Sequence, residues 1–269
     1  MALTLDCQSV ESTLESLHHI FRLPASQIST LIESFDCDAY AEAHPNDCRK
    51  LKEILPELLC NHGGSRQSPT IVYWFHGTRA LSESSLAKGL NPLNLQFDQI
   101  CEDLYSLAMN WIDHSQWQVF KNEVTQGDGL ESSQRIRHRL AFKDDWGPHG
   151  VLVRDALIQP NRFSAVNYLY APETIEDICE SFEKHFGYDL LAQFIRASRP
   201  YIVKIKEEPP RYDVIGSALA YLWCWLRDED CVMCNTCLDS GSTIIPASAI
   251  VEIQEIPLEK CPSSLHQSE

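Results

Sequence analysis

Hydrophobic residues recur at helical spacing through the first sixty positions of the chain. The apolar positions 10, 14, 17 and 20 share one helical face, as do positions 28, 31, 32 and 35 after Pro24. Residues 50–59 continue this pattern, and a stretch rich in glycine, serine and proline follows over residues 61–69. We therefore predict an N-terminal helical segment over residues 1–68 that ends in this loop.

Beyond the loop, the pattern changes to short runs typical of β-strands. Residues 71–75 are wholly apolar, residues 200–206 alternate, and residues 250–256 are rich in isoleucine and valine. Similar apolar runs predict strands over residues 150–154 and 242–246. Helical spacing predicts helices over residues 81–88, 97–125 and 175–195, whereas the apolar residues 214–227 fit either a helix or a strand. This order of elements predicts an α+β domain over residues 69–258 and a flexible tail over residues 259–269.

Charge and composition narrow the class of protein. The chain has 269 residues, of which 44% are hydrophobic, and a net charge of −16. A field of that sign repels free nucleic acid, so a protein partner is the stronger expectation. Arg135, Arg137, His138 and Arg139 form a dense basic cluster, which fits either a solvated helix face or a local basic groove.

From the sequence we expect neither a bilayer-spanning run nor a secretory signal. Its longest apolar runs are far too short to cross a membrane, and residues 1–6 lack a basic region followed by a long apolar core. We therefore expect no membrane partner. The expected location is the cytoplasm, or a host cytosol reached as an effector through another export route.

Four of the eleven cysteines lie close together in the sequence. Cys231, Cys234 and Cys237 have the spacing C-x2-C-x2-C, and Cys224 precedes them. Thiolates at this spacing can close on one metal ion, so a structural zinc site is one hypothesis. An iron–sulfur cluster fits the spacing less well, and free buried thiols are the other hypothesis. The irregular spacing of all eleven cysteines favours a reducing compartment.

The first predicted strand ends in the polar tetrapeptide His76-Gly77-Thr78-Arg79. A neutral histidine at a strand end can hydrogen-bond hydroxyl groups, and a neighbouring glycine lets the backbone approach a ligand closely. This arrangement is typical of a strand that carries a binding group into a cleft.

The sequence around this tetrapeptide resembles the ADP-ribosyltransferases, most closely the poly-ADP-ribose polymerase and diphtheria-toxin branch. His76-Gly77-Thr78-Arg79 and the following Leu86-Ala87-Lys88-Gly89-Leu90 match its first motif. Gly150-Val151-Leu152-Val153 and then Ser164-Ala165-Val166-Asn167-Tyr168 resemble the segment that carries a stacking tyrosine. Residues 200–206 and 242–256 resemble the late strands. The resemblance implies a split mixed β-sheet core that binds NAD as a substrate.

The resemblance also implies a role for each matched residue. His76 would contact the adenosine-side ribose, and Gly77 would pair with the nicotinamide amide. Thr78 and Arg79 would shape the pocket, with Arg79 as a candidate contact of the pyrophosphate. Ser164 would line the site, and Tyr168, or alternatively Tyr170, would stack on nicotinamide.

The sequence departs from the family at the catalytic glutamate. The matching position holds Ser242, and Asp239 lies three residues earlier. A carboxylate is needed to stabilise positive charge at the anomeric carbon, so Asp239 is the candidate catalytic acid, together with His76 and Tyr168. Glu252 and Glu255 alternate with apolar residues, which predicts the solvent face of a strand.

Two classes of function follow from these observations. The first is an NAD-dependent enzyme, a toxin, effector or defence protein, that transfers ADP-ribose to a macromolecule and releases nicotinamide. The second is a catalytically silent module that keeps the NAD or ADP-ribose cleft and acts through a protein held by the N-terminal helices. An RNA 2′-phosphotransferase shares the fold of the family but needs a basic pocket, which the net charge of −16 disfavours.

Overall fold

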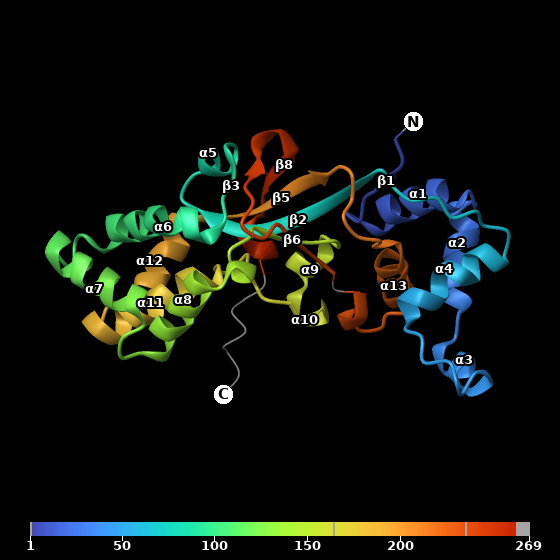
Figure 1. The fold of residues 1–269 in the computed structure, drawn as a ribbon, viewed down its shortest axis with the longest axis horizontal. Coiled ribbons are helices and arrows are strands. Elements are labelled where there is room, and N and C mark those ends of the chain that lie inside the picture. Colours follow the sequence, from blue (N-terminus) through green and yellow to red (C-terminus); the bar gives the residue numbers. More distant parts are fainter. Residues whose placement is uncertain (1, 164, 235, 262–269) are drawn as a thin grey trace. The chain divides into compact units, whose positions relative to one another are not determined.

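The computed structural model describes residues 2–163, 165–234 and 236–261 as a mixed α/β protein (Figure 1). Its larger sheet has the strand order β6-β4-β2-β5-β8, and β1 also pairs with β2. The strands are β1 (Thr4–Leu5), β2 (Ile71–Ala80), β4 (His149–Val151), β5 (Arg199–Glu207), β6 (Cys237–Asp239) and β8 (Ile250–Glu255). The coarse prediction of helices combined with a β-sheet is therefore confirmed.

The sheet is mixed in direction. Strand β1 runs parallel to β2, whereas β4 is antiparallel to β2 and places Val151 opposite Phe75. A separate two-stranded sheet pairs β3 (Gly89–Leu90) with β7 (Ile245–Pro246) in antiparallel fashion. Of the predicted late strands, residues 250–256 match β8 (Ile250–Glu255), while residues 242–246 shorten to β7.

The chain divides into two compact units. One unit comprises residues 1–75, 151–166 and 204–238, and the other comprises residues 76–150, 167–203 and 239–269. The predicted boundary at residue 69 stays a prediction. In the structure, β1 and the later chain segments share one unit with the N-terminal helices.

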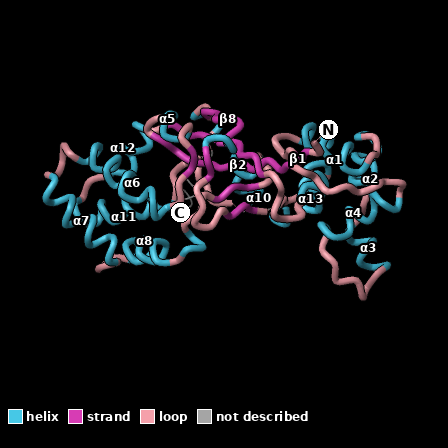
Figure 2. The backbone as a smooth tube through the Cα atoms, turned by 45° about the horizontal axis from the view of Figure 1, so that its top comes forward, coloured by secondary structure: helices cyan, strands magenta, loops and turns pink. Residues whose placement is uncertain are grey.

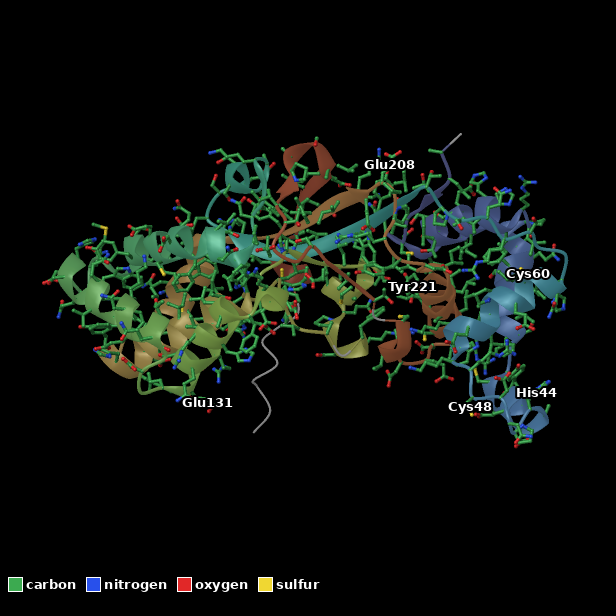
Figure 3. All side chains as sticks on the ribbon, in the orientation of Figure 1. His44, Cys48, Cys60, Glu131, Glu208 and Tyr221 are labelled. Carbon is green, nitrogen blue, oxygen red and sulfur yellow. The ribbon has the colours of Figure 1, made fainter. Side chains whose placement is uncertain are left out.

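In the first unit, α13 (Ile215–Leu226) packs against α1 (Val10–Phe21), α2 (Ala25–Ser34) and α4 (Leu51–Asn61), as Figure 1 shows. The apolar residues of α13 are buried nearly all round, which explains why their pattern alone fits a helix or a strand. Tyr221 of this helix donates a hydrogen bond to Asp155 (2.8 Å) and is labelled in Figure 3. The unit also contains α3 (Cys37–Ala43), α9 (Asp155–Ile158), α10 (Pro160–Phe163) and the 3₁₀-helix η2 (Val232–Cys234).

In the second unit, five helices surround an aromatic core that includes Trp117, Phe120 and Phe182. They are α6 (Leu93–Ala108), α7 (His114–Gln126), α8 (Glu131–Ala141), α11 (Glu173–Phe186) and α12 (Leu190–Ala197), and they lie together in Figure 2. The single helix predicted over residues 97–125 is two helices, because Asp113 caps a new N-terminus and accepts a hydrogen bond from the Gln116 amide (2.9 Å). The unit also contains α5 (Glu83–Leu86) and the 3₁₀-helices η1 (Lys143–Asp145), η3 (Ala247–Ala249) and η4 (Leu258–Lys260).

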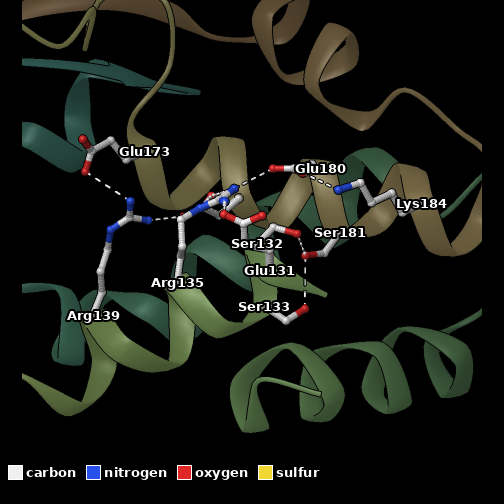
Figure 4. A network of polar contacts seen from close by, with 10 residues as sticks. Glu131, Ser132, Ser133, Arg135, Arg139, Glu173, Glu180, Ser181 and Lys184 are labelled. Carbon is white, nitrogen blue, oxygen red and sulfur yellow. Dashed lines mark hydrogen bonds and ion pairs between the residues drawn. The ribbon is translucent and has the colours of Figure 1, made fainter. Parts of the chain in front are cut away.

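The basic cluster on α8 joins that helix to α11. The Asp177 carboxylate accepts hydrogen bonds from Arg135 (2.7 Å) and Arg139, and Arg135 also pairs with Glu180 at 2.6 Å. Figure 4 shows this network together with the Arg139–Glu173 and Lys184–Glu180 pairs. Arg135 and Arg139 are therefore paired with carboxylates, which argues against a basic groove built on these two side chains.

No helix within the described residues combines the length and the apolar character needed to cross a membrane.

Candidate functional site

His76 lies in β2, where that strand runs beside β4, and its side chain is partly exposed. Its Nδ1 is 2.7 Å from the backbone carbonyl oxygen of His149. A carbonyl oxygen can only accept, so Nδ1 carries the proton of the neutral ring. Burial lowers the pKa of His76 below its ordinary value. The ring is therefore neutral near pH 7, and Nε2 keeps a lone pair that can accept a hydrogen bond from a hydroxyl group.

His149 and Asp239 extend this arrangement across the next two strands. Nδ1 of His149 lies 3.7 Å from Oδ1 of Asp239, which belongs to β6 at the edge of the sheet path. Because β2, β4 and β6 are successive neighbours in the sheet, His76 is bonded to the backbone of His149, and the ring of His149 lies beside Asp239. We call His76, His149 and Asp239 the histidine–aspartate cluster.

The carboxylate of Asp239 is held by a tight turn. Its Oδ1 accepts a hydrogen bond from the Gly241 amide (2.7 Å). A Cβ atom added to Gly147 would lie 2.7 Å from the same oxygen and 2.6 Å from the Gly241 carbonyl. Only glycine fits at residue 147, so the backbone there closes directly on the Asp239 turn. The side chain of Asp239 remains 44% exposed, which leaves the carboxylate accessible to a ligand.

His149 and Gly147 did not emerge as candidates from the sequence alone. The signal that could have revealed His149 is the dipeptide His149-Gly150, which repeats His76-Gly77. The register of Phe75 opposite Val151 places these two dipeptides against each other on antiparallel strands. The repeat becomes informative only when the pairing of β2 with β4 is known.

Arg79 has a structural environment that differs from its predicted role. Its side chain is 5% exposed. The guanidinium donates to the Ser198 hydroxyl (3.0 Å) and to the carbonyl oxygens of Leu169 (3.0 Å), Ile195 (2.8 Å) and Ser198 (3.2 Å). All three of its nitrogens are thus bonded within the protein. The prediction of a pyrophosphate contact assumed a guanidinium available to a ligand, and the structure contradicts that assumption.

The bond from Arg79 to Leu169 anchors the turn that carries Tyr168 and Tyr170. Both tyrosines are partly exposed on either side of the buried Leu169. The Asn167 side chain supports the turn by accepting a hydrogen bond from the Tyr170 amide (3.1 Å). Side chains alternate between the two faces of a strand, so Arg79 and His76 project from opposite faces of β2. The stacking of Tyr168 or Tyr170 on nicotinamide stays a prediction, and Ser164 lies outside the described residues.

Gly77 and Thr78 remain beside His76 in β2. Gly77 is buried, and Thr78 is partly exposed on the same face as His76 by strand alternation. Both positions lie inside β2, which continues to Ala80 beyond the strand end expected at residue 75, and their individual contacts with NAD stay predictions.

Two segments that carry the family resemblance pair with each other. Gly89 stands opposite Pro246, and Leu90 stands opposite Ile245. Gly89 has φ +112°, and an added Cβ would lie 2.6 Å from the Ile245 carbonyl oxygen. This position therefore requires glycine for its conformation and for the close approach of the two strands.

The carboxylates of β8 behave as expected for a surface strand. Glu252 is exposed, and Glu255 is paired with Arg199 at 3.8 Å. Both lie on the edge strand β8. Of the acidic residues considered from the sequence, it is Asp239 that lies beside a histidine of the candidate site.

Two cavities of the structure lie in the first unit. One, of about 660 Å³, is lined by β1 and α1 residues such as Asp6, Glu15 and His19. The other, of about 600 Å³, is lined by residues near α4 and the start of α13, among them Lys52 and Arg66. The residues lining these cavities do not include His76 or Asp239. We therefore base the site on side-chain geometry and not on a cavity.

Three of the four clustered cysteines are buried in the first unit, whereas Cys237 is exposed. The described part of the chain contains no group of three or more histidine, cysteine or acidic side chains arranged to hold a metal ion. The predicted zinc site with Cys224, Cys231, Cys234 and Cys237 as ligands is not supported by this geometry.

Comparison with known proteins adds no family: no family model, curated protein or solved structure matches this chain. The chemistry of the site itself therefore indicates the function. A neutral histidine with a free acceptor nitrogen and a half-exposed carboxylate can bind a sugar hydroxyl and stabilise a nearby positive charge.

Proposed function

We propose that the protein cleaves the bond between nicotinamide and ribose in NAD and transfers ADP-ribose to a macromolecular acceptor. The observation that carries the proposal is the histidine–aspartate cluster, which supplies a hydroxyl-binding imidazole on β2 and a carboxylate on β6, with β4 and His149 between them. The pairing of Gly89–Leu90 with Ile245–Pro246 adds support, because it joins two segments of the family resemblance.

In this reaction the glycosidic bond breaks with its electron pair going to nicotinamide. The anomeric carbon then carries positive charge, and a nucleophilic group of the acceptor attacks it and loses a proton. Asp239 stabilises the positive charge as it develops, since a carboxylate near an oxocarbenium ion favours the transition state. His76 accepts a hydrogen bond from a ribose hydroxyl through Nε2 and orients the sugar.

The test combines NAD cleavage with acceptor labelling. Purified protein is incubated with NAD, nicotinamide release is followed by chromatography, and label from adenine-labelled NAD is followed on proteins of a cell lysate. We expect Asp239→Asn to lower the cleavage rate by a factor on the order of 10²–10³, because it removes a charge-stabilising group. We expect His76→Ala to weaken NAD binding and to slow cleavage.

Matched controls separate the site from the rest of the molecule. His114→Ala removes an exposed histidine of α7, and Asp128→Asn removes an exposed aspartate of the α7–α8 turn. Both variants should cleave NAD at the rate of the wild type. A wild-type protein that neither binds NAD nor releases nicotinamide would refute the proposal, and so would full activity of Asp239→Asn.

The second candidate function is a binding module without catalysis. It is favoured by Ser242 at the position of the family glutamate. It is also favoured by the bond from the Gly241 amide to Oδ1 of Asp239, which occupies part of the carboxylate. Calorimetric binding of NAD that is lost in His76→Ala, without any nicotinamide release by the wild type, would identify this function instead.

A further inference from the structure

Three cysteines that are separated in the sequence meet in the interior of the first unit. Cys224 lies in α13, and Cys231 and Cys234 lie at the 3₁₀-helix η2, which packs against α13. Their exposed fractions are 1%, 0% and 0%. The Cys234 thiol donates a hydrogen bond to the Cys231 carbonyl oxygen (2.9 Å), and the Cys231 thiol donates one to the Glu229 carbonyl oxygen (3.7 Å). We call Cys224, Cys231 and Cys234 the thiol cluster.

The backbone brings Cys231 and Cys234 into a geometry that suits a disulfide. The Cys234 amide donates to the Cys231 carbonyl oxygen (3.1 Å), which is the i to i+3 bond of a 3₁₀ turn. Residues three apart in such a turn lie on the same side, and three rises of about 2 Å separate their Cα atoms by roughly 6 Å along the axis. Disulfides usually join Cα atoms that are about 4.4–6.8 Å apart. The pair can therefore be bridged with little movement of the backbone.

The environment of Cys231 also suits the thiolate, which is the reactive form of cysteine. The neighbouring thiols of Cys224 and Cys234 and the guanidinium of Arg162 lower the pKa of Cys231 below its ordinary value. Arg162 is itself held in place, because it donates to the carbonyl oxygens of Cys224 (3.2 Å) and Glu229 (3.1 Å). A negative charge on Cys231 is thus stabilised by the nearby, permanently charged guanidinium of Arg162.

We propose that the thiol cluster is a redox site in which a peroxide oxidises Cys231 and Cys234 to a disulfide. The Cys231 thiolate attacks one oxygen of hydrogen peroxide, the O–O bond breaks, and hydroxide leaves as Cys231 becomes a sulfenic acid. The Cys234 sulfur then attacks Cys231, the S–O bond breaks, and water leaves. Two thiols lose two hydrogens in total, and the peroxide is reduced to two molecules of water.

The burial of the cluster selects the oxidant. All three sulfurs are shielded by surrounding side chains, so a bulky protein disulfide cannot reach them, whereas a small uncharged molecule can enter during local opening. Cys224 does not lie in the 3₁₀ turn. It remains a free thiol after oxidation.

The test is differential alkylation of the whole protein before and after treatment with hydrogen peroxide, followed by mass spectrometry of the peptides. We expect one new species that has lost two hydrogens within residues 231–234, with Cys224 still free. Cys231→Ser and Cys234→Ser should abolish this species. Cys224→Ser should retain it, as should Cys101→Ser, a control at an isolated buried cysteine of α6.

The exposed thiols of Cys48 and Cys60, labelled in Figure 3, report whether the oxidant reached the protein at all. Oxidation of these two thiols while Cys231 and Cys234 remain fully reduced would overturn the proposal. A disulfide that joins Cys224 to either partner would overturn the assignment of the pair. One equivalent of zinc in the purified wild type, lost in Cys231→Ser, would replace the redox site by a metal site. The mapping of the wild type decides the question even if a variant fails to fold.

Discussion

Replacement of Arg79 by lysine distinguishes a structural role of this residue from a ligand-binding role. Lysine keeps the positive charge that a pyrophosphate would need, but it lacks the planar fork of donors. The native guanidinium makes four hydrogen bonds to acceptors of the Leu169 turn, α12 and Ser198. A single ammonium group cannot reach acceptors placed around a fork, so we expect at least two of the four bonds to be lost.

The loss can be given a magnitude from the burial of the site. Arg79 is 5% exposed, so acceptors that lose their donor are not reached freely by water. Each unsatisfied buried acceptor costs about 1–3 kcal/mol. Two such groups predict a fall of roughly 2–6 kcal/mol in the free energy of unfolding for Arg79→Lys. That is a large part of the 5–15 kcal/mol by which a typical domain is stable, in order of magnitude.

The assay is urea denaturation followed by circular dichroism, with NAD affinity measured separately by calorimetry. Arg199→Lys is the matched control, because Arg199 is an exposed neighbour whose pairing with Glu255 at 3.8 Å is a surface contact. We expect this control to lose less than about 1 kcal/mol. An Arg79→Lys protein that is as stable as the wild type but binds NAD weakly would refute the structural role and restore the pyrophosphate contact.

Three further predictions follow from particular contacts. Asp177→Asn should lower the free energy of unfolding by about 3 kcal/mol in urea denaturation, because it leaves arginines of α8 without their buried carboxylate, whereas the exposed Asp128→Asn should change it little. Gly89→Ala should lower the melting temperature more than Gly129→Ala: both positions have positive φ, but only at Gly89 would the new Cβ meet a backbone atom at 2.6 Å. An equal fall in both variants would contradict this difference. Since burial lowers the pKa of folded His76 below its unfolded value near 6.5, the unfolded state binds more protons between these two values. The free energy of unfolding should therefore rise as the pH increases through that window and fall as the pH decreases through it. This rise should be smaller in His76→Asn, which urea denaturation between pH 5 and 8 would measure.

The sequence predicted elements whose pattern is local. The strand over residues 200–206 and the helices of the first sixty residues follow from alternation and helical spacing, and the structure contains them as β5, α1, α2 and α4. The type of residues 214–227 could not be decided, since an element buried on all sides shows no polar face. Its nature as α13 depends on its packing against α1, α2 and α4.

The site was less predictable, because its parts meet through pairing between strands. His76 and Asp239 were found from the sequence, but His149, which lies between them, requires knowledge that β4 separates β2 from β6. The same holds for the thiol cluster. The spacing of the cysteines suggested four equivalent ligands, whereas the turn at η2 buries two of them with Cys224 and leaves Cys237 exposed.

The tetrapeptide at the end of β2 shows why chemistry alone could not assign every role. In the sequence, His76, Gly77, Thr78 and Arg79 are one polar patch after an apolar run, and all four were interpreted as groups around one ligand. In a strand, neighbouring side chains point to opposite faces, so the patch divides into two sets. His76 and Thr78 share one face of β2, on which Nε2 of His76 can accept a hydrogen bond. The side chain of Arg79 is buried on the other face and donates a hydrogen bond to the Leu169 carbonyl oxygen, in the turn that carries Tyr168 and Tyr170. If Tyr168 or Tyr170 contributes to binding, its position therefore depends on Arg79. A substitution of Arg79 would then alter NAD affinity by displacing the turn that carries the tyrosines, and not by removing a direct contact with NAD.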